Sequence, residues 1–257
     1  MAEAILGLHG ITRDFDSFRA VDSVSFDIER GSITGLIGPN GAGKTTLFNV
    51  LAGMLPPTAG QVELNGRDVT RLSSNRLFGH GLGRTFQIPR PFAKMSVLEN
   101  VMLAPLAQLG ERWFGPFLHA DNVRQQEVAI RAKAMEVLEF VTLDSLADHA
   151  AGQISGGQMK LLELARVLMG DPELILLDEP AAGVNPTLTA VLIEKIEELN
   201  RRGKTFVIIE HDMDFVMQHC NPVIALAEGK IVFQGTPEEA QANPILLDAY
   251  LGAQFDE

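Results

Sequence analysis

The sequence predicts an α/β fold with a mainly parallel sheet, an N-terminal antiparallel β subdomain and an inserted helical subdomain. Residues 24–28 alternate apolar and polar side chains, the pattern of a strand with one buried face. Residues 174–177 and 205–209 are unbroken apolar runs, typical of parallel strands that are covered on both faces. Between these two runs, apolar residues recur at helical spacing, so strand, helix and strand alternate as in a parallel α/β sheet.

Other elements follow from local signals. A short apolar stretch over residues 32–37 predicts a strand, and residues 61–64 predict another before the hairpin-turn dipeptide Asn-Gly at 65–66. The string Thr-Pro-Glu-Glu at 236–239 predicts a helix start, because its threonine can cap the helix and its last glutamate can complete a capping box.

The middle of the chain differs in character. Apolar side chains at helical spacing predict a helix over about residues 122–141, whereas residues 105–116, which include Trp113, predict a loop or irregular insertion. We therefore expect a helical subdomain over approximately residues 89–151, inserted into a single domain that spans residues 1–257.

The composition excludes several classes of protein. Of the 257 residues, 46% are hydrophobic and 21% are charged, which is ordinary for a globular chain and excludes a disordered or fibrous one. The net charge of -12 disfavours binding to nucleic acid, a polyanion.

Cys220 is the one cysteine, so no disulfide can form within the chain. The apolar runs fall far short of the roughly 18 residues that a membrane-spanning helix needs. The mean hydropathy of +0.11 is slightly high, as an apolar partner surface would make it.

A phosphate-binding loop is predicted directly after the strand at 32–37. The motif G-x-x-x-x-G-K-[ST] is matched in full by Gly38, Pro39, Asn40, Gly41, Ala42, Gly43, Lys44 and Thr45, and a helix continues from Thr46. Glycines let backbone N–H groups turn towards phosphate oxygens, and the helix N-terminus adds positive partial charge. Lys44 is expected to reach the β- and γ-phosphates and Thr45 to ligate Mg²⁺. The structural alternative, a plain glycine-rich turn, is disfavoured because the strand, the helix and every motif position are present.

Two acidic residues end the apolar run at 174–177. Asp178 would stand at the carboxyl end of a buried strand, where ligands of α/β sheets bind, and is expected to hold Mg²⁺ directly or through water. Glu179 is then expected to orient and polarise the attacking water. Without the phosphate loop, two solvated acids would be the simpler interpretation.

A second glycine-containing string precedes another apolar helical stripe. It consists of Ser155, Gly156, Gly157 and Gln158. Backbone donors at the helix N-terminus could bind an anion, and a simple cap by Ser155 is the structural alternative. Because one nucleotide needs only one phosphate loop, a second anion site calls for another explanation.

With these motifs in this order, the chain resembles the ATP-binding cassette (ABC) ATPases over nearly its whole length. In that family the Ser-Gly-Gly-Gln string is the signature and contacts the γ-phosphate of ATP bound to a second subunit, so two cassettes enclose two ATP molecules head to tail. The resemblance implies a P-loop NTPase core that binds ATP and Mg²⁺ and hydrolyses ATP.

The resemblance also implies roles for three further side chains. Gln87 matches the glutamine near Mg²⁺ and the attacking water, and His211 matches the histidine that contacts the γ-phosphate. Phe15 matches the aromatic residue that stacks on adenine, with Phe18 as the alternative. Taken singly, each would be an ordinary loop, capping or core residue.

Two positions depart from the family pattern. Ile154 opens the signature where leucine is commonest, and Asn185 stands where many cassettes have aspartate. The second departure concerns communication between the two ATP sites and leaves ATP binding unaffected.

Four segments resemble those of the ATPases of branched-chain amino acid importers. They are the string Arg-Thr-Phe-Gln at 84–87, the insertion with Trp113, the loop 181–186 and the ending 249–252. This resemblance implies an identical or related second ABC subunit, transmembrane permease subunits and, indirectly, a solute-binding protein. It implies a peripheral position at the cytoplasmic face of the inner or plasma membrane. Importers of urea, amides or other polar solutes have similar cassettes and remain the alternative.

A different class of ABC protein acts in solution on DNA or ribosomes, usually with a coiled coil between the motifs or two cassettes in one chain. A single cassette with a short helical insertion and an acidic charge disfavours that class. A P-loop kinase or GTPase would have no use for the signature, and the guanine-reading string Asn-Lys-x-Asp does not occur in the sequence.

Overall fold

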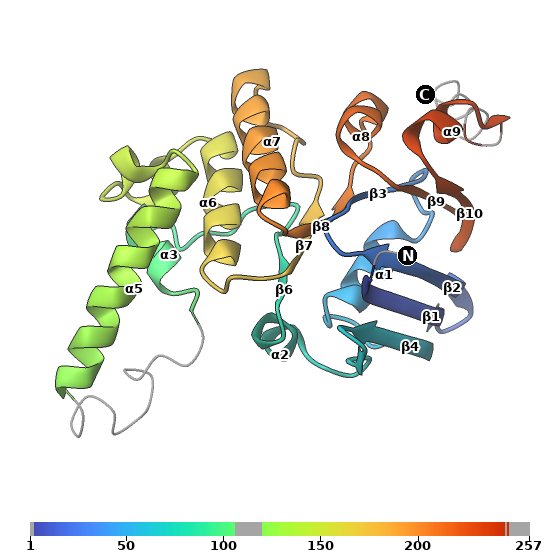
Figure 1. Ribbon diagram of the computed structural model, residues 1–257, viewed down its shortest axis with the longest axis horizontal. Helices are drawn as coiled ribbons and strands as arrows, with labels where there is room; N and C mark the ends of the chain where they lie inside the picture. The colour runs from blue at the N-terminus through green and yellow to red at the C-terminus, as the bar shows by residue number, and fades with distance from the viewer. Residues whose placement is uncertain (1–2, 106–119, 245, 247–257) are drawn as a thin grey trace. The chain divides into compact units, whose positions relative to one another are not determined.

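The computed structural model describes residues 3–105, 120–244 and 246 (Figure 1). The chain divides into two compact units. The first comprises Met1–Arg84, Glu173–Pro180 and Glu197–Glu257, and the second comprises Thr85–Pro172 and Ala181–Ile196. Two β-sheets belong to the first unit, whereas the second is built from helices and their connecting loops.

The larger sheet of the first unit has six strands. In order across the sheet they are β10 (Lys230–Gly235), β9 (Val223–Ala227), β3 (Ile33–Ile37), β8 (Thr205–Ile209), β7 (Leu174–Asp178) and β6 (Leu82–Arg84). The strands from β9 to β6 run parallel, and β10 pairs antiparallel with β9. Every residue of β7 and β8 is buried, which explains why both sequences are continuous apolar runs. These two strands and β3 confirm the sequence prediction.

The register of β3, β8 and β7 brings three loops to one edge of this sheet. Leu36 of β3 pairs with Ile209 of β8, and Ile209 pairs with Asp178 of β7. Because the three strands are parallel and in register, the segments that follow them leave the sheet at the same level. The phosphate loop, Glu179 and the segment to His211 therefore begin at neighbouring strand ends, where α/β sheets bind their ligands.

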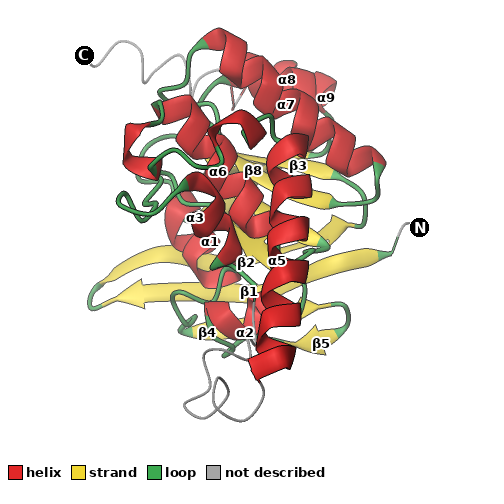
Figure 2. Cartoon of the chain, turned by 90° about the vertical axis from the view of Figure 1, so that its left-hand side faces the viewer, coloured by secondary structure: helices red, strands yellow, loops and turns green. Residues whose placement is uncertain are grey.

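The smaller sheet contains β2 (Phe18–Glu29), β1 (Ala4–Phe15), β4 (Ala59–Leu64) and β5 (Arg67–Asp68), in that order and with antiparallel pairing (Figure 2). Burial alternates along β2, where Val24, Phe26 and Ile28 are buried and the residues between them are exposed. Asn65 and Gly66 both have positive φ angles and connect β4 to β5, as expected for a two-residue hairpin turn. The predicted antiparallel region is thus confirmed.

The helices of the first unit are α1 (Lys44–Leu51), α2 (Ser74–Gly79), α8 (Met213–His219) and α9 (Pro237–Gln241). Leu47, Phe48 and Leu51 of α1 pack into a core that also contains buried side chains from both sheets. This packing fixes the helix that follows the phosphate loop. Helix α9 begins with the predicted capping box, formed by Thr236 and Glu239.

The second unit contains α3 (Val97–Met102), α5 (Ala120–Phe140), α6 (Gly156–Leu168) and the greater part of α7 (Pro186–Arg201), with 3₁₀ turns at Asp144–Leu146 and Ala151–Gln153. Helix α5 confirms the helix predicted over residues 122–141. Trp113 and the ending 249–252 lie outside the described residues, and the inserted subdomain of about 89–151 stays a prediction. Within the described ranges, none of the helices has the length and hydropathy needed to cross a bilayer.

The buried thiol of Cys220 provides a test of the packing at the end of α8. Burial, and secondarily the charge of Glu210, raise the pKa of this thiol from 9.0 to about 12. Above about pH 9 the unfolded chain loses the thiol proton whereas the native protein keeps it, so the free energy of unfolding falls by about 1.4 kcal/mol per pH unit until about pH 12. Between about pH 8 and pH 10.5, urea unfolding should show a loss of about 2 kcal/mol more in the wild type than in Cys220→Ala. Equal losses in the two proteins would contradict a buried, protonated thiol.

Candidate functional site

The phosphate loop follows β3, and two of its glycines occupy positions where a side chain does not fit. Gly38 has a φ of 148°, and a Cβ atom there would lie 2.2 Å from the main-chain oxygen of Leu226. Gly43 has a φ of 97°, and its Cβ would lie 2.3 Å from the main-chain oxygen of Ala20. Both obstacles are backbone atoms, which cannot move aside cheaply, so the path of the loop depends on glycine at these two motif positions.

Lys44 holds the loop in shape from within. The residue is 5% exposed, and its ammonium group donates hydrogen bonds to the main-chain oxygens of Gly38 at 2.6 Å and Pro39 at 2.9 Å. Burial lowers the pKa of Lys44, while the negative charge of Glu179 acts in the opposite direction. Phosphate oxygens are charged and would be stronger acceptors for this ammonium than the two neutral carbonyl groups.

The first turn of α1 adds backbone donors to the same loop. Helix geometry leaves the N–H groups of Lys44, Thr45 and Thr46 without an acceptor inside the helix, and the N-cap residue Gly43 has no side chain to accept them. Asn40, Gly41 and Thr45 are exposed, whereas Ala42 is buried. These donors and the positive end of the helix dipole suit a phosphate group.

Asp178, the last residue of β7, is paired with a cation that sequence reasoning missed. Nη2 of Arg84, at the end of β6, lies 2.9 Å from Oδ2 of Asp178, and both side chains are nearly buried. Nη1 of Arg84 donates to Asn49 of α1 at 2.7 Å, and the guanidinium lies over the ring of Phe48, 5.1 Å from its centroid. Arg84 therefore connects β6, β7 and the helix that follows the phosphate loop.

Thr45 and Asp178 offer the kind of oxygen donors that Mg²⁺ prefers. In nucleotide sites Mg²⁺ takes one or two protein oxygens and completes its coordination with phosphate and water. Thr45 is exposed on the first turn of α1, and the contact of Asp178 with Arg84 uses Oδ2, which leaves Oδ1 for a further ligand. The residues present thus fit a magnesium ion that is shared with a bound nucleotide.

Glu179 and His211 form a pair. Glu179 has a left-handed φ of 47°, a conformation that costs a non-glycine residue roughly 1–2 kcal/mol. A hydrogen bond from its N–H to the oxygen of Ile209, at 2.9 Å, holds this turn. The Oε1 atom of Glu179 lies 2.7 Å from Nε2 of His211, with the two side chains 15% and 44% exposed. Sequence reasoning assigned roles to these residues separately, and the structure brings their side chains into contact.

Phe15 and Phe18 are both exposed, and they pair across the turn between β1 and β2. The guanidinium of Arg13 lies over the ring of Phe15, 4.7 Å from its centroid. This cation stabilises the position of Phe15 by an attraction to the ring face. Which of the two aromatic residues stacks on adenine stays a prediction.

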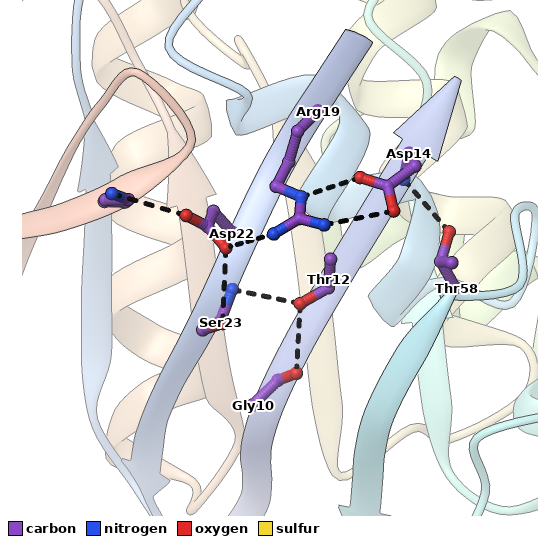
Figure 3. Close-up of polar contacts among 8 residues, drawn as sticks. Gly10, Thr12, Asp14, Arg19, Asp22, Ser23 and Thr58 are labelled. Carbon is purple, nitrogen blue, oxygen red and sulfur yellow. Dashed lines mark hydrogen bonds and ion pairs between the residues drawn. The ribbon is translucent and has the colours of Figure 1, made fainter. Parts of the chain in front are cut away.

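A polar network braces the hairpin that carries these two aromatic residues (Figure 3). Arg19 lies between two carboxylates, with Nε 2.8 Å from Asp14 and Nη1 3.1 Å from Asp22. The hydrogen bond to Asp14 is the main cause of a raised pKa for Arg19, and a hydrogen bond from Lys230 is the main cause of a lowered pKa for Asp22. The N–H of Asp14 also donates to Thr58 at 3.0 Å, which joins β1 to the segment before β4.

In the second unit, Ser155 is the N-cap of α6. Its hydroxyl accepts a hydrogen bond from the N–H of Gln158 at 3.3 Å, and the Gln158 side chain accepts one from the N–H of Ser155 at 2.8 Å. A Cβ added to Gly156 would meet no atom within 4 Å, whereas one added to Gly157 would lie 2.6 Å from Leu188. The helix-cap interpretation is therefore confirmed, and an anion contact at this exposed start of α6 stays a prediction.

Asn185 caps α7. Its side-chain oxygen accepts the N–H of Leu188 at 3.0 Å. Asparagine and aspartate cap helices about equally well, so the departure at this position preserves the helix start while it removes a negative charge.

Gln87 is exposed in the loop after β6, and its main-chain oxygen accepts a hydrogen bond from the buried Lys160 of α6 at 2.6 Å. Sequence reasoning did not single out Lys160 or Arg84, although a signal exists for the lysine. Lys160 stands four residues before Leu164, one turn from a position of the apolar stripe of the predicted helix. A cation at such a position indicates a buried polar partner.

Comparisons with known proteins support the same interpretation. The chain matches the family model described as ABC transporter over residues 21–182. It is 41% identical over 255 residues to the probable branched-chain amino acid transport ATP-binding protein LivG of Archaeoglobus fulgidus. This match covers 98% of this chain and 97% of the relative. It is 36% identical over 253 residues to the high-affinity branched-chain amino acid transport ATP-binding protein BraF of Pseudomonas aeruginosa. This match covers 98% of this chain and 99% of the relative.

Solved structures agree with the fold. A nucleotide-free ATP-binding cassette from an ABC transporter superposes with a TM-score of 0.85 at 36% identity and covers 96% of this chain and 99% of that one. The ADP conformation of the ATP-binding cassette MJ1267 superposes with a TM-score of 0.83 at 35% identity. This match covers 98% of this chain and 100% of that one. The predicted family and fold class are confirmed, while the roles of single site residues stay predictions. Motif order, fold and relatives agree, and this chain therefore belongs to the ABC transporter family as one of its ATP-binding cassettes.

Proposed function

We propose that this chain is the ATP-binding and ATP-hydrolysing subunit of an importer for branched-chain amino acids. The observation that carries the proposal is the convergence of Lys44, Asp178 and the Glu179–His211 pair at one edge of the six-stranded sheet. This edge has the donors for a triphosphate and a carboxylate to activate water. The names of relatives such as LivG and BraF support the choice of solute.

ATP binds first through its phosphates. Lys44 and the N–H groups at the start of α1 contact the β- and γ-phosphates, and Phe15 or Phe18 stacks on the adenine. Mg²⁺, held by Thr45 and Asp178, would supply positive charge next to the phosphate oxygens. Arg84 holds the carboxylate of Asp178 in a fixed direction through their 2.9 Å ion pair.

Glu179 then acts on the water that attacks the γ-phosphorus. The carboxylate orients this water and accepts its proton, and ADP leaves as the bond to the γ-phosphorus breaks. His211 holds the carboxylate through their 2.7 Å contact and turns to the γ-phosphate when ATP is present. Gln87 contributes to placing Mg²⁺ and the water.

Import requires partners. The exposed Ser155 and the open space around Gly156 suit a contact with ATP held by a second cassette, identical to this chain or related to it. ATP closes this pair and hydrolysis reopens it. The cassettes attach to transmembrane permease subunits at the cytoplasmic face of the membrane, and a solute-binding protein supplies the solute without touching this chain.

Uptake in cells tests the assignment of function. Lys44→Ala removes the positive charge at the phosphates and should reduce the affinity for MgATP by at least about tenfold in a chain that still folds. Cells that carry only this variant should lose uptake of radiolabelled leucine, isoleucine and valine. A strain with unchanged uptake of these amino acids but reduced uptake of urea or amides would show that the solute is different.

Glu179→Gln tests the chemical step, because it keeps the size of the side chain and removes its charge and basicity. We expect ATP turnover to fall by about 10²–10⁴-fold with MgATP binding retained, and the ATP-bound closed dimer to accumulate. Steady-state hydrolysis and ATP-dependent dimerisation should be measured on one preparation, with the second cassette present. Glu194→Gln, at an exposed carboxylate of α7, is the control and should hydrolyse ATP normally. Near-normal turnover in Glu179→Gln would exclude Glu179 as the base.

The segment after Gln87 provides an apolar surface for the permease. Ile88 is 67% exposed, and Phe92, also exposed, has the guanidinium of Arg166 6.0 Å from its ring centroid. Pro89 and Pro91 restrict the backbone between them. Exposed apolar side chains on a stiff loop are suited to receive a helix from a membrane subunit.

Ile88→Asp should therefore weaken attachment to the membrane subunits. We expect permease subunits that co-purify with the cassette to fall by at least about tenfold, the effect of losing one buried apolar contact and burying a charge, with MgATP binding unchanged. Val128→Asp is a matched control, because Val128 is 64% exposed on α5 of the same unit. Equal recovery of permease with both variants would argue that the segment is a plain hinge.

A further inference from the structure

Two lysines in the described part of the chain are less than 9% exposed, Lys44 and Lys160. Both ammonium groups donate to main-chain oxygens of a loop. Lys44 bonds to the phosphate loop of the first unit, and Lys160 bonds to the oxygen of Gln87 in the second unit at 2.6 Å. The proposed function accounts for Lys44, while Lys160 has no role in it so far.

Packing alone does not explain a lysine at position 160. Its neighbours along α6, Leu161, Leu162 and Leu164, are almost completely buried, and so is Glu163, whose carboxylate pairs with Arg166 at 2.7 Å. Lys160 therefore stands in the buried part of the helix, while the nearby carboxylate already has a cationic partner. Burying an ammonium group is unfavourable unless strong hydrogen bonds compensate for the lost water. The bond to a carbonyl oxygen 73 residues earlier in the chain is such a bond, and it fixes one point of the loop.

A second anchor lies five residues further along the same loop. Asn100 of α3 is fully buried, accepts the N–H of Phe92 at 2.8 Å and donates to the oxygens of Phe92 at 3.1 Å and Ser96 at 2.8 Å. The segment from Gln87 to Phe92 is therefore held at both ends by buried side chains of the second unit. Its exposed side chains consequently project from a backbone whose course is set in advance.

We infer that Lys160 is the positioning residue for Gln87. By binding the main-chain oxygen, the ammonium sets the direction in which the Gln87 side chain leaves the loop. Because Lys160 belongs to the helix that begins at Ser155, it also makes Gln87 and the start of α6 move together. This inference rests on the proposed role of Gln87 in ATP hydrolysis.

The test compares Lys160→Met with Lys160→Arg in the purified transporter complex, with MgATP as substrate. Methionine keeps the length and apolar stem of lysine and removes its charge and donors, so the melting temperature should stay the same or rise. We expect kcat to fall by at least about tenfold with an unchanged KM for MgATP, because small misplacements of a positioning group cost that much. Lys160→Arg retains a donor and should recover most of the turnover.

Lys133→Met is the matched control. Lys133 of α5 is exposed and donates to the main-chain oxygen of Met169, at the opposite end of α6, at 3.1 Å. The variant therefore loses a lysine–carbonyl bond away from Gln87. It should hydrolyse ATP normally. If Lys160→Met keeps the wild-type kcat, the inference is overturned and Lys160 is dispensable. If Lys160→Met fails to fold, or loses stability and turnover in parallel, the inference is also overturned and Lys160 is purely structural.

A double-mutant cycle with Gln87→Ala separates this inference from the proposed function. If Lys160 acts through the Gln87 side chain, Lys160→Met should cause little further loss of turnover once that side chain is absent. If the fold-losses of turnover in the two single variants multiply in the double variant, Lys160 does not act through the Gln87 side chain. If Gln87→Ala has low turnover and Lys160→Met has normal turnover, only the inference about Lys160 is overturned. If Gln87→Ala has normal turnover, the proposed role of Gln87 in ATP hydrolysis is overturned.

Discussion

The candidate site depends on the shared register of three parallel strands. Because Leu36, Ile209 and Asp178 align across β3, β8 and β7, the phosphate loop, Glu179 and His211 all start from one level of the sheet. A slip of one residue in β7 would turn Asp178 to the opposite face. Complete burial of β7 and β8 makes such a slip costly, since every apolar side chain would change its surroundings. The hydrophobic core thus determines the chemistry at the edge of the sheet.

Charges at this edge are partnered within the protein itself. Lys44 bonds to loop carbonyls, Arg84 neutralises Asp178, and His211 contacts Glu179. Buried charges without such partners would be expensive, so the pairs allow a polar site to persist inside an apolar sheet. They also prepare the site for ligand, because charged groups that are already oriented need little rearrangement when a phosphate arrives. The cost of the left-handed turn at Glu179 is part of the same preparation.

Sequence reasoning succeeded where the signal was local. Apolar runs and alternation predicted the strands. The cap at Ser155 and the capping box of Thr236 with Glu239 were also predicted, because a cap is a local signal. It missed Arg84 and Lys160, whose partners are 94 and 73 residues away. Periodicity shows that a position is buried, but only the register and packing of separate elements show which polar group it meets there. The contact between Glu179 and His211 was missed for the same reason, since each follows a different strand.

Arg84 and Gln87 are three residues apart and are held by different elements. Arg84 is fixed to β7 and α1 of the first unit, whereas the main-chain oxygen of Gln87 is fixed to α6 of the second unit. The chain crosses from one unit to the other between Arg84 and Thr85, so few backbone dihedral angles separate the two anchors. The bond from Lys160 to the main-chain oxygen of Gln87 also ties this end of the loop to the helix that Ser155 caps.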